Sequence, residues 1–469
     1  MKKFRNKITV AVLTMVMLSC SDNFLELQPQ QSVADTQALT TLEDFKSAIT
    51  GVYNDLSNSD YYGRYFILIP DVMSDDVKQN SQANRVRNYA EYVATRADDD
   101  AEDIWEVMYE ANVAANAIIN SEVEVPAAVQ ADKDHIVGEA YALRGLIYFD
   151  MVRLFAQSYQ FTADASHLGV PIVLKFDQLS TPARNTVAEV YAQVISDMQK
   201  ALTLMKDTPR SGNTATLSAT AVKALLARVY LYKADWANAE AMATEVINSG
   251  KYSLVSNANY VSSWSSDYSS ESIFEISMTP SDNRGSDALG RMYIVEGYGD
   301  YLPSDDVYSL IPAGDARQGL YKPDPGLSGA FAPFRMNKYP SVKGEDNTKV
   351  IRLSEMYLIR AEARAMKSSP DEPGARADVN EIRLRGLPTA TPTASSGPAL
   401  LDDIARERRI ELAFEGQRLW DLMRKKQGVV RNQCTSPICS IPYPNDRFVL
   451  PIPQAEIDAN PVIQPNPGY

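Results

Sequence analysis

The stretch AVKALLARVYLYKADWANAEAMATEVINSGKY, residues 221–252, decides the fold because its small and aromatic residues recur at the spacing of two paired helices. Ala227, Ala239 and Ala243 are small enough to let two antiparallel helices approach closely, and Tyr230 can fill the groove between them. The pattern therefore predicts a helical hairpin, either as one unit of a helical repeat or as a hairpin without repeat ancestry.

Further copies of this pattern occur elsewhere in the chain. In residues 354–386 the same offsets are occupied by Ala363, Met366, Ala375, Val379 and Ile382. A degenerate third copy spans 140–155 and 187–204, and Thr186 with Glu189 forms a capping box before its second helix. The offsets match the tetratricopeptide (TPR) repeat. Because the copies are scattered and interrupted, we expect a mainly α fold, a TPR-like helical-hairpin scaffold that carries insertions.

The other segments divide between helices and irregular chain. Apolar residues at helical spacing predict helices in 40–56, 103–123 and 135–157. Residues 57–100 read as polar loops, and residues 251–345 mix Gly, Pro, Ser and Asp with Tyr, although 272–278 alternates like a short strand. The tail, 451–469, contains five prolines and is expected to be extended rather than helical. Long irregular insertions are usually functional, so we expect a loop-rich ligand-binding subdomain with a few short strands.

The first twenty residues have the pattern of a lipoprotein export signal. Four basic residues precede an apolar run, 8–18, that is too short to span a bilayer. The sequence Met17-Leu18-Ser19-Cys20 resembles a bacterial lipobox, in which the cysteine is acylated and becomes the mature N-terminus, although Met17 stands where Leu is usual. We predict a signal peptide at 1–19 and lipid attachment at Cys20. The alternative is an ordinary signal peptide followed by an incidental cysteine.

Charge and cysteine usage exclude several classes of function. The formal charge of −14 becomes −18 when residues 1–19 are removed, since they hold four basic residues and no acidic residue. This argues against binding to nucleic acid or to anionic lipid. Cys434 and Cys439 could close a small disulfide loop in an oxidising compartment, or remain free thiols. No second cysteine pair or histidine pair completes a zinc site, so we expect no metal and no cofactor, and we interpret His135 and His167 as surface residues.

Two charged clusters could suggest chemistry. Asp98, Asp99 and Asp100 lack the spacing of an EF-hand and are interpreted as a solvated helix N-terminus. Near the C-terminus, charges recur three or four residues apart, which predicts ion pairs along one helix: Glu407, Arg408, Arg409, Glu411, Glu415, Arg418, Asp421 and Arg424. Glu411 and Glu415 could act as an acid–base pair only if their pKa values were well separated. The neighbouring arginines would instead keep both glutamates ionised. We therefore expect structural ion pairs and a protein that is not an enzyme.

Taken together, several segments resemble the SusD/RagB family of outer-membrane nutrient-binding lipoproteins. They are NFLELQP (23–29), DVMSDDV (71–77), LRGLIYFDMVRLF (143–155), VIRLSEMYLIRAEA (350–363), RERRIELAFEGQRLWDLMR (406–424) and LPIPQAEIDANPVIQPNPGY (450–469). The resemblance covers nearly the whole chain after Cys20, in the expected order. It implies a single body, 20–469, with an N-terminal helical part at 20–250, an irregular insertion at 251–345 and a C-terminal part at 346–469.

The resemblance also implies a function. Such proteins are non-catalytic, are held on the surface of a Gram-negative outer membrane by the lipid on the cysteine, and form a lid over a SusC-like TonB-dependent transporter. They capture oligosaccharides, or peptides in some members, and deliver them. Ser21 and Asp22 resemble the acidic export signal of surface lipoproteins.

Candidate ligand-binding residues follow from the region that forms the ligand side in this family. Sugars present apolar C–H faces and hydroxyl rims, which suit tyrosine rings beside planar polar groups. In NRVRNYAEYVATR (84–96) and GRMYIVEGYGDYLPSDDVY (290–308) we select Arg87, Tyr89, Tyr92, Tyr293, Tyr298 and Tyr301. The alternative for each tyrosine is packing inside the irregular subdomain. Trp236 and Trp264 are interpreted as core residues, and Asn112 and Asn116 as helix-packing residues.

Four functions remain as hypotheses. The first is glycan capture for a transporter, and the second is the same uptake role with oligopeptides, which an acidic protein would tolerate if they are cationic. The third is a surface hydrolase, for which the sequence offers no nucleophile motif. The fourth is a TPR interaction scaffold without a small ligand.

A Cys20→Ala variant tests the lipid anchor. The variant should fold normally but lose membrane association, because the acylated sulfur would be the attachment point. Fractionation of cells into membrane and soluble material provides the measurement, and tight membrane retention of the variant would contradict the prediction.

Overall fold

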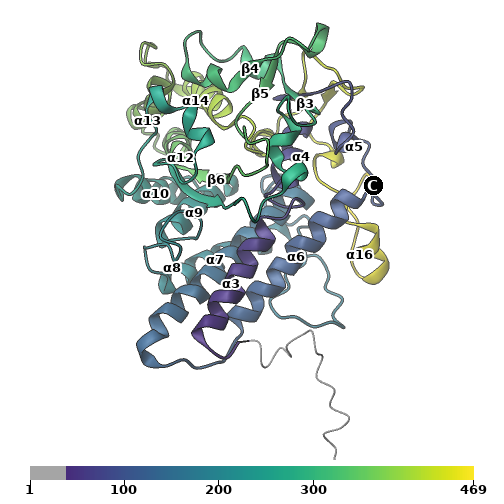
Figure 1. The fold of residues 1–469 in the computed structure, drawn as a ribbon, viewed down its shortest axis with the longest axis vertical. Coiled ribbons are helices and arrows are strands. Elements are labelled where there is room, and N and C mark those ends of the chain that lie inside the picture. The colour runs from purple at the N-terminus through teal and green to yellow at the C-terminus, as the bar shows by residue number, and fades with distance from the viewer. Residues whose placement is uncertain (1–38) are drawn as a thin grey trace, which may run out of the picture.

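The computed structural model describes residues 39–469, which form a tapering body with long helices at one end and irregular chain at the other (Figure 1). The expected signal peptide, Cys20 and the Ser21–Asp22 pair lie outside the described residues. Between residues 39 and 469, no helix is both long and apolar enough to cross a membrane.

The predicted helical hairpins are confirmed. The first is α9 (Ala219–Lys233) with α10 (Trp236–Asn248), and the second is α12 (Leu353–Met366) with α13 (Glu372–Gly386). Ala227, Ala239 and Ala243 are fully buried where the first pair packs. The two pairs also contact each other through α10 and α12, so the repeats form one continuous scaffold.

Long helices form the lower half of the scaffold in Figure 1. They are α3 (Leu42–Leu56), α6 (Asp99–Ile119), α7 (Gln130–Phe155) and α8 (Val187–Leu204). The predicted capping box of Thr186 and Glu189 is present at the start of α8. In α7, a Cβ on Gly145 would lie 3.0 Å from the Met198 side chain of α8, so the small residue allows the close approach.

The irregular end is held together by four two-stranded antiparallel sheets. They pair β1 (Val77–Gln79) with β3 (Tyr301–Pro303), β2 (Ser272–Ile276) with β6 (Thr348–Arg352), β4 (Tyr321–Pro323) with β5 (Phe334–Met336), and β7 (Val429–Val430) with β8 (Ser440–Ile441). The expected strand within 272–278 is therefore β2. Because β1 and β3 lie far apart in the sequence, their pairing attaches the insertion to the N-terminal part of the chain.

Two regions contain more helix than the sequence suggested. Within 57–100 the structure has α4 (Tyr65–Met73) and the short α5 (Arg87–Ala90). All nine residues of α4 are buried, because its run of apolar side chains packs inside the scaffold rather than forming a polar loop. The tail contains α16 (Gln454–Ala459) and is pinned where the Asn466 amide donates to the carbonyls of Phe155 and Leu450.

The two histidines are not free surface residues. His135 lies inside α7 with 5% of its surface exposed, and its Nδ1 accepts a hydrogen bond from the backbone N–H of Lys206. His167 is half-buried, and its ring contacts Thr162 and the Gln157 carbonyl.

The C-terminal charged residues form ion pairs, but they do not lie on one helix. Helix α14 (Gly397–Leu412) ends before Glu415, and α15 (Arg418–Arg424) begins after it. Most of these residues pair with charges from distant segments. The Arg409 guanidinium, for example, lies 2.6 Å from the Asp76 carboxylate. The sequence spacing therefore predicted the pairing of charges but assigned it wrongly to neighbours on one helix.

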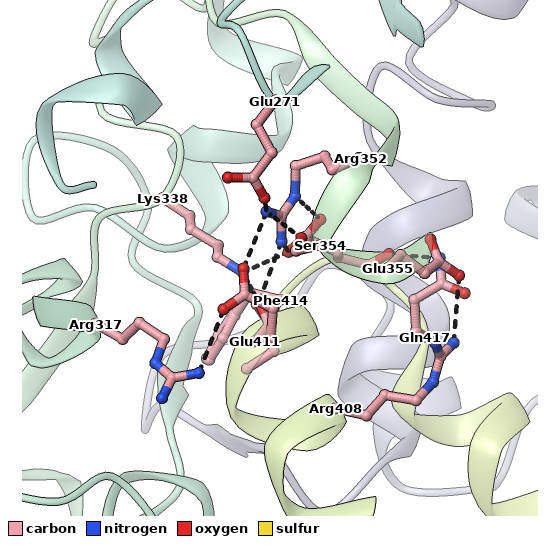
Figure 2. A network of polar contacts seen from close by, with 12 residues as sticks. Glu271, Arg317, Lys338, Arg352, Ser354, Glu355, Arg408, Glu411, Phe414 and Gln417 are labelled. Carbon is pink, nitrogen blue, oxygen red and sulfur yellow. Dashed lines mark hydrogen bonds and ion pairs between the residues drawn. The ribbon is translucent and has the colours of Figure 1, made fainter. Parts of the chain in front are cut away.

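A buried ionic network joins Glu271 and Lys338 of the irregular end to the C-terminal segment 352–415 (Figure 2). Its centre is Arg352 at the end of β6, which lies 2.6 Å from Glu271, 3.0 Å from Glu411 and 2.7 Å from Glu415. Lys338 adds a contact of 2.6 Å to Glu415. Burial would raise the pKa of Glu411, but the surrounding arginines and Lys338 hold that pKa well below its ordinary value.

A second buried chain of charges links the two TPR-like pairs to α14 and α15. Arg228 lies 2.5 Å from Glu355, which lies 3.4 Å from Arg408. From Arg408 the chain continues through Asp421 to Arg424, which contacts Glu362 at 2.6 Å. Burial opposes ionisation of Glu362, yet Arg424 and Lys425 lower its pKa to about 2.

Arg352→Met should lower the free energy of unfolding by about 3–5 kcal/mol, because it leaves buried glutamates without their partner. Urea denaturation measures this difference. Lys46→Met is the control, since Lys46 forms an exposed pair with Glu43 and should change stability by less than about 1 kcal/mol. Equal effects of the two variants would contradict a central role for Arg352.

Glu362→Gln tests the pH dependence of the second chain of charges. The pKa of Glu362 is lowered on folding, so its stabilising contribution is present above its ordinary value near 4.5 and is lost as the pH falls toward about 2. The stability difference between the two proteins should therefore shrink between pH 6 and pH 2, as the protonated acid becomes an uncharged counterpart of Gln. Urea titrations across this range measure it, and a constant difference would contradict the prediction.

Candidate functional site

An open basin of about 550 Å³ is lined by residues of α5. Figure 1 shows α5 at the irregular end of the molecule. The walls of the basin are the turn 84–91 and the first residues of α6, and its lining consists of Tyr65, Asn84, Arg85, Val86, Arg87, Asn88, Glu91, Val93, Asp98, Asp99 and Asp100. The lining places amide, guanidinium and carboxylate groups around one depression, which suits a ligand rich in hydroxyl groups.

Pairing of β1 with β3 positions this basin. Just after β1, the Asn80 backbone N–H donates to the Asp300 carbonyl at 2.8 Å, and its side-chain amide donates to the Gly299 carbonyl at 2.9 Å. The Tyr301 hydroxyl then donates to the Arg85 carbonyl at 2.6 Å. These bonds fix the turn 84–91 against the insertion.

Val86 holds the turn in an unusual backbone conformation. Its φ of 47° is left-handed, which a β-branched residue rarely adopts and which costs about 1–3 kcal/mol. The side chain is 2% exposed, so its burial in the core supports the strained turn. As a result, the two flanking arginines, Arg85 and Arg87, are both on the basin wall.

Arg85 connects the basin to an exposed aromatic ring. Its guanidinium lies 3.3 Å from the ring centroid of Tyr298 and 3.1 Å from the Asp300 carboxylate. Tyr298 is 40% exposed, whereas most tyrosines of the irregular side are buried. Stacking with a cation holds the ring in place and leaves part of it free to contact a ligand.

Gly299 allows the chain to pass close to Arg335 beside this ring. Its φ is +58°, and a Cβ there would lie 2.0 Å from the Arg335 guanidinium. Arg335 donates to the Gly299 carbonyl at 2.7 Å and contacts Asp324 at 2.9 Å. The glycine and the arginine together define the shape of the loop that carries Tyr298.

The electrostatics of the basin are mixed. Arg87 lies 2.7 Å from Glu91, and its side chain is 52% exposed. The acidic residues 99 and 100 occupy the first turn of α6, after Asp98 at the N-cap, as predicted, and burial raises the pKa of Asp100. Over residues 39–469, no group of three or more His, Cys, Asp or Glu side chains could hold a metal ion.

Two of the six predicted ligand residues, Arg87 and Tyr298, are exposed at or beside the basin. The other four are buried, with exposed fractions of 8% or less: Tyr89, Tyr92, Tyr293 and Tyr301. The expected exposure of these four rings is therefore wrong, because they pack in the core and support the surface from below. Their hydroxyls show this role, since Tyr92 donates to the Met73 carbonyl and Tyr293 to the Asp71 carboxylate.

Sequence reasoning missed Arg85 and the acidic wall of the basin. Arg85 lies two residues before Arg87, in the segment already selected, but its contact with Tyr298 joins residues more than two hundred positions apart. No local pattern reports such a contact. Asp98, Asp99 and Asp100 were recognised as a helix start, but their place opposite the turn depends on how α6 packs.

A disulfide joins Cys434 and Cys439 in the loop between β7 and β8. The Thr435 hydroxyl donates to the carbonyl of Gln79, the last residue of β1. Arg431 donates to four nearby carbonyls, including that of Ala90 at 2.8 Å. The loop therefore supports the strand and the turn that form the basin.

The other residues singled out by the sequence have mixed outcomes. Asn112 and Asn116 both donate to the Val173 carbonyl, which confirms their packing role. Trp264 is 3% exposed, as expected for the core. Trp236 is only half-buried: it packs against the core from the first position of α10, at the edge of a cavity.

The fold and the basin define a class of TPR-like scaffold proteins whose irregular face carries the surface basin. The SusD family model matches residues 334–469, and a family described as "starch-binding associating with outer membrane" matches residues 23–231. The chain belongs to the SusD family.

Individual relatives agree with this assignment. A SusD superfamily protein from Bacteroides thetaiotaomicron has 31% identity and a TM-score of 0.84, covering 91% of this chain and 100% of its own. A putative sugar binding protein from Bacteroides vulgatus has 28% identity and a TM-score of 0.84, with 92% and 100% covered. SusD-like protein P2 from Formosa agariphila is 28% identical, and both chains are fully covered.

Gly299→Ala should destabilise the loop that carries Tyr298, because the new Cβ collides with Arg335 and also strains the positive φ. We expect a loss of about 2–4 kcal/mol, seen as a lower Tm. Gly212→Ala is the matched control, because Gly212 also has a positive φ but has no atom within 4 Å of its Cβ position. Its loss of stability should therefore come only from the strained backbone and should be smaller. Equal losses would show that the Arg335 guanidinium moves aside without measurable cost, and would contradict the prediction.

Proposed function

We propose that this protein captures oligosaccharides at the basin formed by 84–91 and 98–100, with Tyr298 as the aromatic contact. The arrangement of Arg85 over the exposed ring of Tyr298, beside Asn84, Asn88 and Arg87, carries the proposal. A sugar ring could rest its C–H face on the accessible part of Tyr298 while its hydroxyls bond to the planar polar groups.

The names of relatives support a carbohydrate ligand. The family that matches residues 23–231 is described as starch-binding, and the similar Bacteroides vulgatus structure is named a putative sugar binding protein. A binding role without catalysis agrees with the surface position of the basin and with the pairing of Glu91 to Arg87. The carboxylates of the C-terminal cluster are buried in ion pairs, so they are not available as an acid–base pair.

The proposed role is nutrient uptake at the outer membrane. The protein would be held at the cell surface by a lipid on Cys20 and would act as a lid over a SusC-like TonB-dependent transporter, to which it delivers the glycan. The description of the matching family as associating with the outer membrane supports this placement. The alternative is the same role with oligopeptides, for which Glu91 and Asp98–Asp100 would contact cationic side chains.

Tyr298→Ala and Arg85→Ala should each weaken glycan binding about tenfold or more, since each removes one half of the stacked pair. Isothermal titration against a glycan panel, with a pool of peptides in parallel, provides the measurement. Phe176→Ala is the control, because Phe176 is an exposed aromatic residue outside the basin. Binding of peptides without any glycan, or glycan binding unchanged in both variants, would contradict the proposal.

A further inference from the structure

A separate cavity of about 590 Å³ lies between the TPR-like hairpins and the C-terminal helices. It is bordered by the turn between α9 and α10, the end of α12, and helices α14 and α15. In Figure 1 helices α9, α10, α12 and α14 lie on the left, whereas α5 and β3 beside the basin lie toward the right, and the two linings share no residue. The cavity is therefore distinct from the proposed glycan basin.

One wall of the cavity is apolar and partly exposed. Trp236, Met366 and Leu401 line it, together with the buried Leu231. Ala234 has a φ of 60°, and this left-handed turn brings Trp236 to the first position of α10. A flat indole at the edge of an enclosed depression offers a surface for the C–H face of a sugar ring.

The opposite wall consists of charged side chains, and its buried carboxylates are already paired with arginines. Asp421 accepts from Arg408 and from Arg424, each at 2.8 Å, and Glu362 accepts from Arg424 at 2.6 Å. Each oxygen of these two carboxylates already accepts a hydrogen bond from an arginine. The wall therefore presents donors rather than acceptors to anything in the cavity.

Two lining residues have a buried polar atom without a hydrogen-bond partner among the described residues. Arg408 is 1% exposed, and its Nη1 lacks an acceptor although its Nε and Nη2 are bonded. Gln160 donates from Nε2 to the Tyr232 carbonyl, but its Oε1 lacks a donor. An unsatisfied buried polar group costs about 1–3 kcal/mol, so an acceptor that reached Arg408 Nη1 and a hydroxyl that reached Gln160 Oε1 would recover part of that cost.

Basic side chains at the mouth add to the excess of donors. Lys425 and Lys426 line the cavity, and Lys426 is exposed, with no ion pair recorded for it between residues 39 and 469. Asp402 is the exposed acidic residue of the lining. For a chain with a formal charge of −14, this local excess of cationic groups favours an anionic ligand.

We infer that this cavity binds a sugar that carries a carboxylate. The ring would stack on Trp236, the carboxylate would accept from Arg408 and the two lysines, and a hydroxyl would donate to Gln160 Oε1. The volume is within the range of small-ligand sites and suits one or two sugar rings. The inference goes beyond the proposed function, because it assigns a second site with a preference for acidic sugars.

Titration of the full chain with digalacturonic acid, with maltose as the neutral comparison, tests the inference. Digalacturonic acid should bind and should shield Trp236, the most exposed of the four tryptophans, from quenching of fluorescence by acrylamide. Trp236→Ala and the double variant Lys425→Ala/Lys426→Ala should each weaken this binding about tenfold or more. Lys200→Ala removes an exposed lysine of α8 outside the cavity and should have no effect.

The basin variant Arg85→Ala/Tyr298→Ala separates the two sites. If this variant still binds digalacturonic acid with wild-type affinity, the acidic sugar occupies the cavity. That result holds whether or not the basin binds glycans. Loss of binding in this variant, or undiminished binding in both cavity variants, would overturn the inference. Equal affinity of the cavity for maltose would overturn its preference for a carboxylate.

Discussion

The burial of the Arg352 guanidinium among three glutamates is the interaction on which the rest of the structure depends. Glu271 comes from the irregular insertion, whereas Glu411 and Glu415 come from the C-terminal part, so one side chain ties both to the start of α12. Charges removed from water cost several kcal/mol each unless they are paired with good geometry. This requirement restricts how the segment around Glu271 can sit on the helical scaffold.

The basin depends on a second junction, the pairing of β1 with β3. Its chemical groups come from the turn 84–91 and from the loop of Tyr298, which meet only because β1 pairs with β3. Three features support this junction: the strained backbone of Val86, the close approach of Gly299 to Arg335, and the disulfide loop. A binding surface built from loops on a rigid helical body can change its ligand without changing the body, which agrees with a family whose members keep one scaffold.

Prediction from the sequence succeeded where the signal was local. The TPR-like hairpin of α9 and α10 and the capping box at Thr186 depend on neighbours within a few turns of helix. It failed for α4, whose segment was taken for polar loop, and for the charged residues 407–424, which were placed on one helix. Separations of three or four residues occur both on a solvated helix face and in a buried network, so spacing alone could not distinguish them.

The family could be predicted from the segments that resemble its members, and the helical hairpins from hydrophobic periodicity and small residues at fixed offsets, which act over short distances. Which aromatic side chains are exposed to solvent became clear only from the folded chain. A tyrosine has an apolar face and a polar tip, so it suits a core and a binding surface equally, and four of the five selected tyrosines became core residues. The tertiary structure also decided that Trp236 lies at a cavity and that Arg85 stacks on Tyr298. Burial depends on elements that are distant in the chain and close only after folding.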